Sequence, residues 1–283
     1  MAALLEEHAR LVERYQHLKS EQNRLSARCD ELKTQLHSLL DRCHQIGAQI
    51  EQLRAGPVRP ENVLEKMRTD WDDRARLNAN YYTNSAKYDW SDEEYFETGE
   101  INVREHILTD ITDICQGDDP GRMRILEIGC GAGRMTKALA RLFGEVHAVD
   151  ISSEMIGIAR RNLAGVSNAF FYNNNGMDLS VIPDQPFDFA FSFIVFQHIP
   201  SPEVIESYLR EVHRLLKPGR LFKFQVQGCR PAKQERFDTW LGVAFDVQEM
   251  RNMAARCGFE MRYWHGEGTQ YFWLWFFKTA QPA

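Results

Sequence analysis

The first part of the chain repeats a large aliphatic side chain at every seventh position. The repeat consists of Leu4, Leu11, Leu18, Leu25, Leu32, Leu39, Ile46 and Leu53. Charged and polar residues fill most of the other positions, which is typical of a coiled-coil helix that needs a partner helix. Gly56 and Pro57 end the pattern. The sequence therefore predicts a coiled-coil helix over residues 1–56, with its orientation left open, and a homo-oligomer formed through it.

Residues 57–118 show short helical stretches in which aromatic and charged residues alternate. Examples are "DWDDRARLNANYY" and "YDWSDEEYFETGE". We expect most of these aromatic side chains to pack the helices against the next domain, and about two or three to face a ligand. The seven aromatic residues concerned are Trp71, Tyr81, Tyr82, Tyr88, Trp90, Tyr95 and Phe96. We interpret this segment as a helical cap.

Beyond the turn residues of "GDDPGR", segments with strand character alternate with helical segments. Helix-start signals at Ser152, Ser201 and Asp246 separate them. This alternation predicts an α/β fold with a doubly wound, mostly parallel sheet over residues 119–283. The last two strands are separated only by "GEGT", so we expect a hairpin whose antiparallel last strand, apolar on both faces, lies inside the sheet. The seven expected strands are 124–128, 145–149, 169–173, 187–193, 220–226, 260–265 and 271–278.

Composition and charge narrow the possible partners. The 283 residues are 43% hydrophobic and carry a net charge of −6, and residues 57–118 hold much of the acidic excess. Nucleic acid and anionic membrane surfaces are therefore not expected as partners. No apolar run is long enough to cross a bilayer, and the six cysteines lack a zinc-type spacing. We expect a cytoplasmic protein with reduced thiols, no membrane segment and no metal.

The glycine-rich stretch "EIGCGAGR", residues 127–134, follows the first expected strand. A dinucleotide fingerprint that starts at Gly129 would need a glycine where Arg134 stands, and a phosphate-binding P-loop would need Gly-Lys-Ser or Gly-Lys-Thr. Glu127 lies two residues before the first glycine, where its carboxylate would repel a phosphate. The pattern therefore favours a ligand that is partly cationic.

The spacing of Gly129, Gly131 and Gly133 after Glu127 resembles motif I of the class I S-adenosylmethionine-dependent methyltransferases. The resemblance implies S-adenosylmethionine as the cofactor, with Glu127 helping to hold its methionine moiety. Asp150, followed by Ile151, comes directly after the second expected strand. A carboxylate there can accept hydrogen bonds from both ribose hydroxyls, a feature that many nucleotide-binding folds share.

Two further motifs extend the resemblance, which covers about residues 120–279. "NNNGMDL" places Asn175 and Gly176 where this family contacts adenine, although Asn-Gly is also an ordinary turn. "FDFAFSFIVFQHIP" places Ser192 and Phe193 near the methionine arm, and His198 in the following turn. We interpret the acids of "TDWDDR" as helix-start residues rather than as metal ligands.

These features predict methyl transfer to an oxygen or nitrogen atom of a small molecule such as a secondary metabolite, sugar or amine. His198 is the candidate general base, with the alternative that it packs against or caps its turn. A second hypothesis is a coiled-coil assembly or binding protein with a methyltransferase-like module, for example in surface glycan modification. A nicotinamide-dependent reductase is disfavoured because the third fingerprint glycine is missing.

Overall fold

The computed structural model describes residues 60–229 and 239–279, together with single helical positions at 14, 19, 21, 24, 28 and 35. The chain divides into two units, residues 1–58 and 59–283. Apart from these single positions, the predicted coiled coil lies outside the described residues, so it and the oligomer stay predictions, as do the domain boundaries at 56 and 118.

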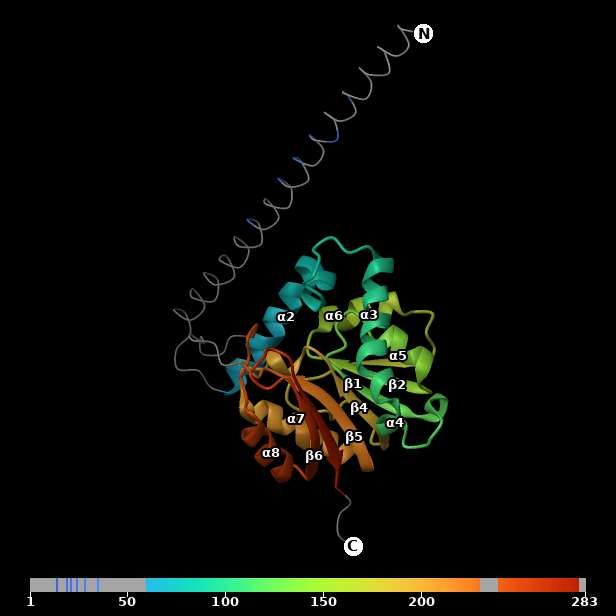
Figure 1. Cartoon of the computed structure of the whole chain (residues 1–283), viewed down its shortest axis with the longest axis vertical. Helices are drawn as coiled ribbons and strands as arrows, with labels where there is room; N and C mark the ends of the chain where they lie inside the picture. Colours follow the sequence, from blue (N-terminus) through green and yellow to red (C-terminus); the bar gives the residue numbers. More distant parts are fainter. Residues whose placement is uncertain are drawn as a thin grey trace. The chain divides into compact units, whose positions relative to one another are not determined.

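The second unit is built around one seven-stranded sheet with the strand order β3-β2-β1-β4-β5-β7-β6 (Figure 1). The first five strands are parallel, and β7 runs antiparallel to both of its neighbours, β5 and β6. The predicted α/β class and the antiparallel last strand inside the sheet are therefore confirmed. The strands are β1 (Arg124–Ile128), β2 (Glu145–Asp150), β3 (Ala169–Asn173), β4 (Phe187–Ser192), β5 (Leu216–Val226), β6 (Phe259–His265) and β7 (Phe272–Lys278).

The helices begin where the sequence supplies capping side chains. Ser152 and Ser201 accept hydrogen bonds from the first turns of α6 and α7, and Asp246 forms a capping box with Glu249 at α8. These three predicted starts are confirmed. The helices are α2 (Pro60–Thr83), α3 (Asp92–His106), α4 (Ile111–Cys115), α5 (Thr136–Leu142), α6 (Ser153–Asn162), α7 (Pro202–Leu215) and α8 (Val247–Arg256).

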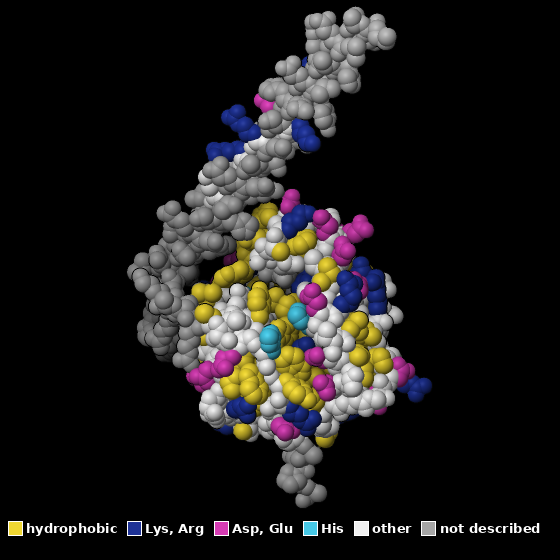
Figure 2. Space-filling model, in the orientation of Figure 1, with side chains coloured by type: hydrophobic (Ala, Val, Ile, Leu, Met, Phe, Trp, Pro, Cys, Tyr) yellow, Lys and Arg dark blue, Asp and Glu magenta, His cyan; other side chains and the backbone are white. Residues whose placement is uncertain are grey.

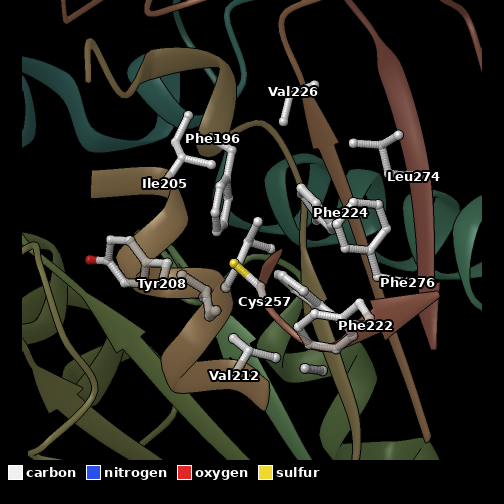
Figure 3. Close-up of a cluster of buried hydrophobic side chains, with 14 of the residues drawn as sticks. Phe196, Ile205, Tyr208, Val212, Phe222, Phe224, Val226, Cys257, Leu274 and Phe276 are labelled. Atoms are coloured by element: carbon white, nitrogen blue, oxygen red, sulfur yellow. The ribbon is translucent and has the colours of Figure 1, made fainter. Parts of the chain in front are cut away.

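Two apolar clusters hold helices against the two faces of the sheet. On one face, α7 and α8 pack against the alternating aromatic residues of β5 and β7, including Phe222, Phe224 and Phe276 (Figure 3). On the other face, α3, α4 and α5 bury Ile107, Ile114 and other side chains against β1, β2 and β4. Burial on both faces explains why the central strands are continuous apolar runs.

The order of the strands reverses between β1 and β4, because β2 and β3 follow on one side of β1 while β4 and β5 follow on the other. In doubly wound sheets, the carboxyl ends of the strands at this switch point leave a crevice that ligands occupy. Helix α2 lies beside this edge and contacts α6. The fold therefore places the glycine-rich loop after β1 and the segment after β4 at the mouth of one pocket.

Candidate functional site

The glycines of the loop after β1 have backbone conformations that side chains rarely adopt. Gly129, Gly131 and Gly133 have φ values of +75°, +53° and +85°. A Cβ on Gly129 would lie 2.1 Å from a methyl group of Val195, and one on Gly131 would lie 2.6 Å from Cγ2 of Thr83. The loop thus needs glycine both for its turns and for the close approach of α2 and of the segment after β4.

Most backbone N–H groups of the glycine-rich loop donate hydrogen bonds within the protein. Gly129 and Cys130 both donate to the carbonyl oxygen of Val149, and Gly133 donates to the carbonyl oxygen of Cys130. The N–H of Gly131 donates to Oδ2 of Asp150 at 2.9 Å. A phosphate would need such amides free, so the loop does not have the geometry of a phosphate cradle.

Glu127 is a buried carboxylate at the end of β1. The hydroxyl of Thr136 donates to it at 2.6 Å. Burial raises the pKa of Glu127 from its ordinary value to about 7, although this hydrogen bond and the charge of Arg134 oppose the rise. A cation that entered the pocket would favour the charged form of Glu127, and by the same coupling Glu127 would stabilise the cation.

Arg134 is a buried guanidinium that lines the same pocket. Its Nη1 donates to the side-chain oxygens of Thr98 and Asn102 on α3, at 3.1 and 2.6 Å. Burial lowers the pKa of Arg134 below its ordinary value. These two hydrogen-bond partners are neutral, and the positive charge of Arg134 also interacts with Glu127 in the same pocket.

Asp150 ends β2 on the other side of the loop. Its carboxylate accepts from the N–H groups of Gly131 and Ser152, both at 2.9 Å. Burial raises the pKa of Asp150 to about 6, and these two hydrogen bonds oppose the rise. The carboxylate is thus held at the strand end where ribose hydroxyls are recognised in nucleotide-binding folds.

Helix α2 lines one side of the pocket. Of the seven aromatic residues that the sequence pointed to, Trp71 and Tyr82 are among the residues that line it. Asp72 accepts a hydrogen bond from Ser152 at 2.6 Å and another from the N–H of Glu154, so it caps α6. The interpretation of the "TDWDDR" acids as helix-start residues was wrong, because they lie in the interior of α2.

The pocket lies between helix α2, the glycine-rich loop, the end of β2 and the segment after β4. Among the residues that the sequence pointed to, seven line it: Glu127, Gly129, Gly131, Asp150, Ile151, Phe193 and His198. Four do not, namely Gly133, Asn175, Gly176 and Ser192. The hydroxyl of Ser192 donates to the carbonyl oxygen of Ile128 at 2.9 Å, so it links the end of β4 to the end of β1.

His198 has protein partners on both ring nitrogens. Nδ1–H donates to the carbonyl oxygen of Trp240, and Nε2 then accepts from the amide of Gln197 at 3.1 Å. Burial, with the nearby charge of Arg74, lowers the pKa of His198 to about 3. Its role as a general base stays a prediction, and it would require release of the Gln197 bond.

A chain of buried amides continues from His198 to the pocket wall. Gln225 donates to Oε1 of Gln197, and its own Oε1 accepts from the N–H of Ile194 at 3.1 Å. Ile194 lines the pocket with φ at +55°, a strained conformation for a β-branched residue. A continuous series of hydrogen bonds therefore connects the backbone of Ile194 in the pocket wall with the carbonyl group of Trp240.

Sequence reasoning missed several residues of the pocket. Arg134 directly follows the last loop glycine, and Asn174 directly precedes the predicted Asn175, so both were inside motifs that had been singled out. No local sequence signal identifies Thr83 or Tyr208 as a pocket residue. Thr83 ends a long helix, and Tyr208 occupies a position of α7 that the sequence does not distinguish from the other buried positions of that helix.

In residues 60–229 and 239–279, no group of three or more His, Cys, Asp or Glu side chains is arranged to hold a metal ion. In the same residues, no helix combines the length and the apolar composition needed to span a membrane.

Comparisons with known proteins agree with this geometry. Residues 125–219 match a family model described as a methyltransferase domain. The ubiquinone biosynthesis O-methyltransferase of Xanthomonas oryzae pv. oryzae strain PXO99A is 33% identical over 97 residues, which are 34% of this chain. That of Ruegeria pomeroyi is 32% identical over 99 residues, or 35% of this chain. The chain spans 39% of the length of each of these two relatives.

Two solved structures share the fold at low sequence identity. Magnesium protoporphyrin IX methyltransferase from Synechocystis PCC 6803, with bound SAM, superposes with a TM-score of 0.55 and 16% identity, covering 80% of this chain and 100% of that one. The DhpI–SAM–HEP complex gives a TM-score of 0.55 and 18% identity, covering 78% and 99%. Residues 125–219 therefore match a methyltransferase domain, and the described residues share their fold with solved methyltransferase structures that bind S-adenosylmethionine.

Proposed function

We propose that this chain is an S-adenosylmethionine-dependent methyltransferase that methylates an oxygen or nitrogen atom of a small molecule. The observation that supports the proposal most directly is that Glu127 and Arg134 line the same pocket. A buried carboxylate and a buried guanidinium on either side of the glycine-rich loop suit the ammonium and carboxylate groups of an amino acid. Asp150, at the neighbouring strand end, suits the ribose of the same ligand.

The residues present fit this cofactor. Glu127 and Arg134 would hold the amino-acid end, Gly129 and Gly131 would let the backbone approach it, and Asp150 would hold the ribose. When bound, the cofactor supplies an electrophilic methyl group on a positively charged sulphur. Trp71 and Tyr82 present aromatic surface on the side of the pocket that α2 lines. Such a surface favours a cationic centre in the ligand and excludes water from that centre.

The chain itself has to position the acceptor atom. Methyl transfer is an in-line displacement, so the acceptor must be held about 3 Å from the methyl carbon, and positioning of this kind can supply much of the rate enhancement. The names of the two relatives favour an oxygen acceptor. Acidic, basic and apolar side chains are interspersed over the face seen in Figure 2, which suits a neutral or cationic small molecule better than a polyanion.

Calorimetry tests the cofactor assignment directly. We expect S-adenosylmethionine and S-adenosylhomocysteine each to bind at one site per chain, and NAD not to bind. If the folded protein binds neither S-adenosylmethionine nor S-adenosylhomocysteine, the proposal that it is a methyltransferase is contradicted. The hypothesis of an assembly or binding protein would then be favoured. A mass-spectrometric screen for the gain of one methyl group across candidate metabolites would then identify the acceptor.

We further propose that residues 1–56 oligomerise the protein and that it works in the cytoplasm. The support is the seven-residue repeat of aliphatic positions in that segment. Light scattering of the full-length chain and of a variant lacking residues 1–56 tests the oligomer. We expect a dimer or larger species that becomes monomeric on truncation with cofactor affinity retained, and a monomeric full-length chain would contradict it.

A further inference from the structure

Ile194, the second residue after β4, has a backbone conformation that its side chain disfavours. Its φ is +55°, in the left-handed region that is costly for a β-branched residue. In the described part of the chain, the other residue besides glycine with a positive φ is Gln116, at the exposed end of α4, where helices commonly adopt this conformation. Ile194 instead lines the pocket. A strained residue in a pocket wall persists only where a neighbour holds it in place.

The group that holds Ile194 is the amide of Gln225, a fully buried residue of β5. Oε1 of Gln225 accepts a hydrogen bond from the N–H of Ile194 at 3.1 Å. The neighbours of Gln225 on the strand, Phe224 and Val226, point into the apolar cluster of Figure 3, so the amide lies on the opposite face of the sheet. Burying an amide costs free energy unless its hydrogen bonds are made. A hydrogen-bonding residue thus occupies a core position where an apolar one would satisfy packing alone.

Two acceptors fix the orientation of the Gln225 amide. Its Nε2 donates to the backbone carbonyl oxygen of Gln270 at 2.9 Å and to Oε1 of Gln197. A backbone carbonyl can only accept, so turning the Gln225 amide over would bring two oxygen atoms together. Both donors of Gln225 are therefore used by these partners, and its Oε1 remains as the acceptor for the N–H of Ile194.

The segment of residues 193–195 forms the wall of the pocket that faces the glycine-rich loop. All three of its side chains line the pocket. Val195 lies so close to Gly129 that a Cβ on this glycine would be 2.1 Å from one of the Val195 methyl groups. If Ile194 relaxed to a negative φ, the chain would leave it in another direction and Val195 would no longer fit against the loop. The conformation of Ile194 therefore sets the shape of this wall.

We propose that Gln225 is a positioning residue for the binding of S-adenosylmethionine, because its hydrogen bond holds Ile194 in the left-handed conformation that shapes the pocket wall. This inference rests on the proposed function. Gln225 is not among the described residues that line the pocket, so it acts through Ile194 rather than by touching the ligand. Without this hydrogen bond, Ile194 relaxes in most molecules, and the apparent affinity falls with the fraction that keeps the binding conformation.

Calorimetry with S-adenosylhomocysteine tests this role. We expect Gln225→Leu, which removes the acceptor and keeps a side chain of similar size, to weaken binding roughly tenfold. Glycine adopts a positive φ without strain, so when Ile194→Gly is already present, adding Gln225→Leu should weaken binding by less than about threefold. Ile194→Ala is the matched control, because alanine also lacks the isoleucine contacts but keeps the strain. In that background, Gln225→Leu should still weaken binding by about fivefold or more.

The dependence on residue 194 separates positioning from a purely structural role. If Gln225 only stabilised the fold, Gln225→Leu would change the affinity equally in the three backgrounds, and that result would overturn the inference. An unchanged affinity in Gln225→Leu would overturn it as well and leave the cofactor assignment standing. Failure of the folded, unaltered protein to bind S-adenosylhomocysteine would instead contradict the proposed function. If Gln225→Leu does not fold by circular dichroism, Gln225→Asn carries the same expectations, because its shorter side chain withdraws the acceptor from Ile194.

Discussion

Asp72 and Ser152, 80 positions apart in the chain, share a hydrogen bond of 2.6 Å that ties α2 to the start of α6. Asp72 also accepts from the N–H of Glu154, while the N–H of Ser152 donates to Asp150. One side chain of α2 thereby helps to fix the strand end that we assign to the ribose.

Replacing Asp72 should destabilise the fold because it leaves a buried hydroxyl and a helix-start N–H without their acceptor. We expect Asp72→Ala to lower the free energy of unfolding by about 1–3 kcal/mol, measured by urea denaturation. The matched control is Asp73→Ala, which removes an exposed ion pair with Arg76 and should change the same free energy by less than about 0.5 kcal/mol. Equal effects of the two variants would contradict the capping role.

Arg134 should matter only to ligands that carry the amino-acid part of the cofactor. We expect Arg134→Met to weaken S-adenosylhomocysteine binding by roughly 10- to 100-fold, because a buried cation would no longer meet its carboxylate. Binding of 5′-methylthioadenosine, which lacks that carboxylate, should change by less than about threefold in the same titration. Similar losses for both ligands would mean that Arg134 acts through its hydrogen bonds to α3 instead.

Cofactor affinity should depend on the protonation of Glu127. Its pKa is raised to about 7 in the free protein, so below that pH the carboxyl is largely neutral and must lose its proton to pair with an ammonium group. Between pH 6 and pH 8, the affinity for S-adenosylhomocysteine should rise by about tenfold in calorimetry.

Glu127→Gln is the control for this pH dependence, since an amide of the same size does not titrate. Its binding should be weaker at pH 8 and should change little with pH apart from the smaller contribution of Asp150, whose pKa is about 6. An unaltered pH profile in this variant would refute the assignment of Glu127. The raised pKa of Glu127 also affects the stability of the fold. It adds to the free energy of unfolding at pH values below the pKa of this group in the unfolded chain, and this contribution is lost as the pH rises through about 7.

His198 should stay neutral with its proton on Nδ1 well into acidic solution. Burial and the charge of Arg74 lower its pKa to about 3, and the Trp240 carbonyl fixes the tautomer. Long-range nitrogen–proton NMR spectra should therefore show no titration of this ring between pH 8 and pH 5. The loss of the resonance in His198→Gln would assign it, and a titration near neutral pH would instead support a general base.

The sequence alone was sufficient for the features that depend on local pattern. Apolar runs located the strands, and capping side chains at Ser152, Ser201 and Asp246 located helix starts. The two-faced apolar character of "YFWLWFFK" predicted that the last strand lies inside the sheet, because an interior strand buries both of its faces under the two helix layers. The glycine spacing with Glu127 indicated the methyltransferase domain in the same way, since a turn and its close contacts restrict a few adjacent residues.

The tertiary structure was needed wherever function depends on which way a side chain points. Three consecutive asparagines look alike in the sequence, and only the register of the chain leaving β3 directs Asn174 to the pocket and Asn175 into a turn. Asp72 reads as one of several acids at a helix start, yet it caps a different helix 80 residues away. Contacts of this kind are set by the packing of whole elements, and packing energies come from residues that are distant in the chain.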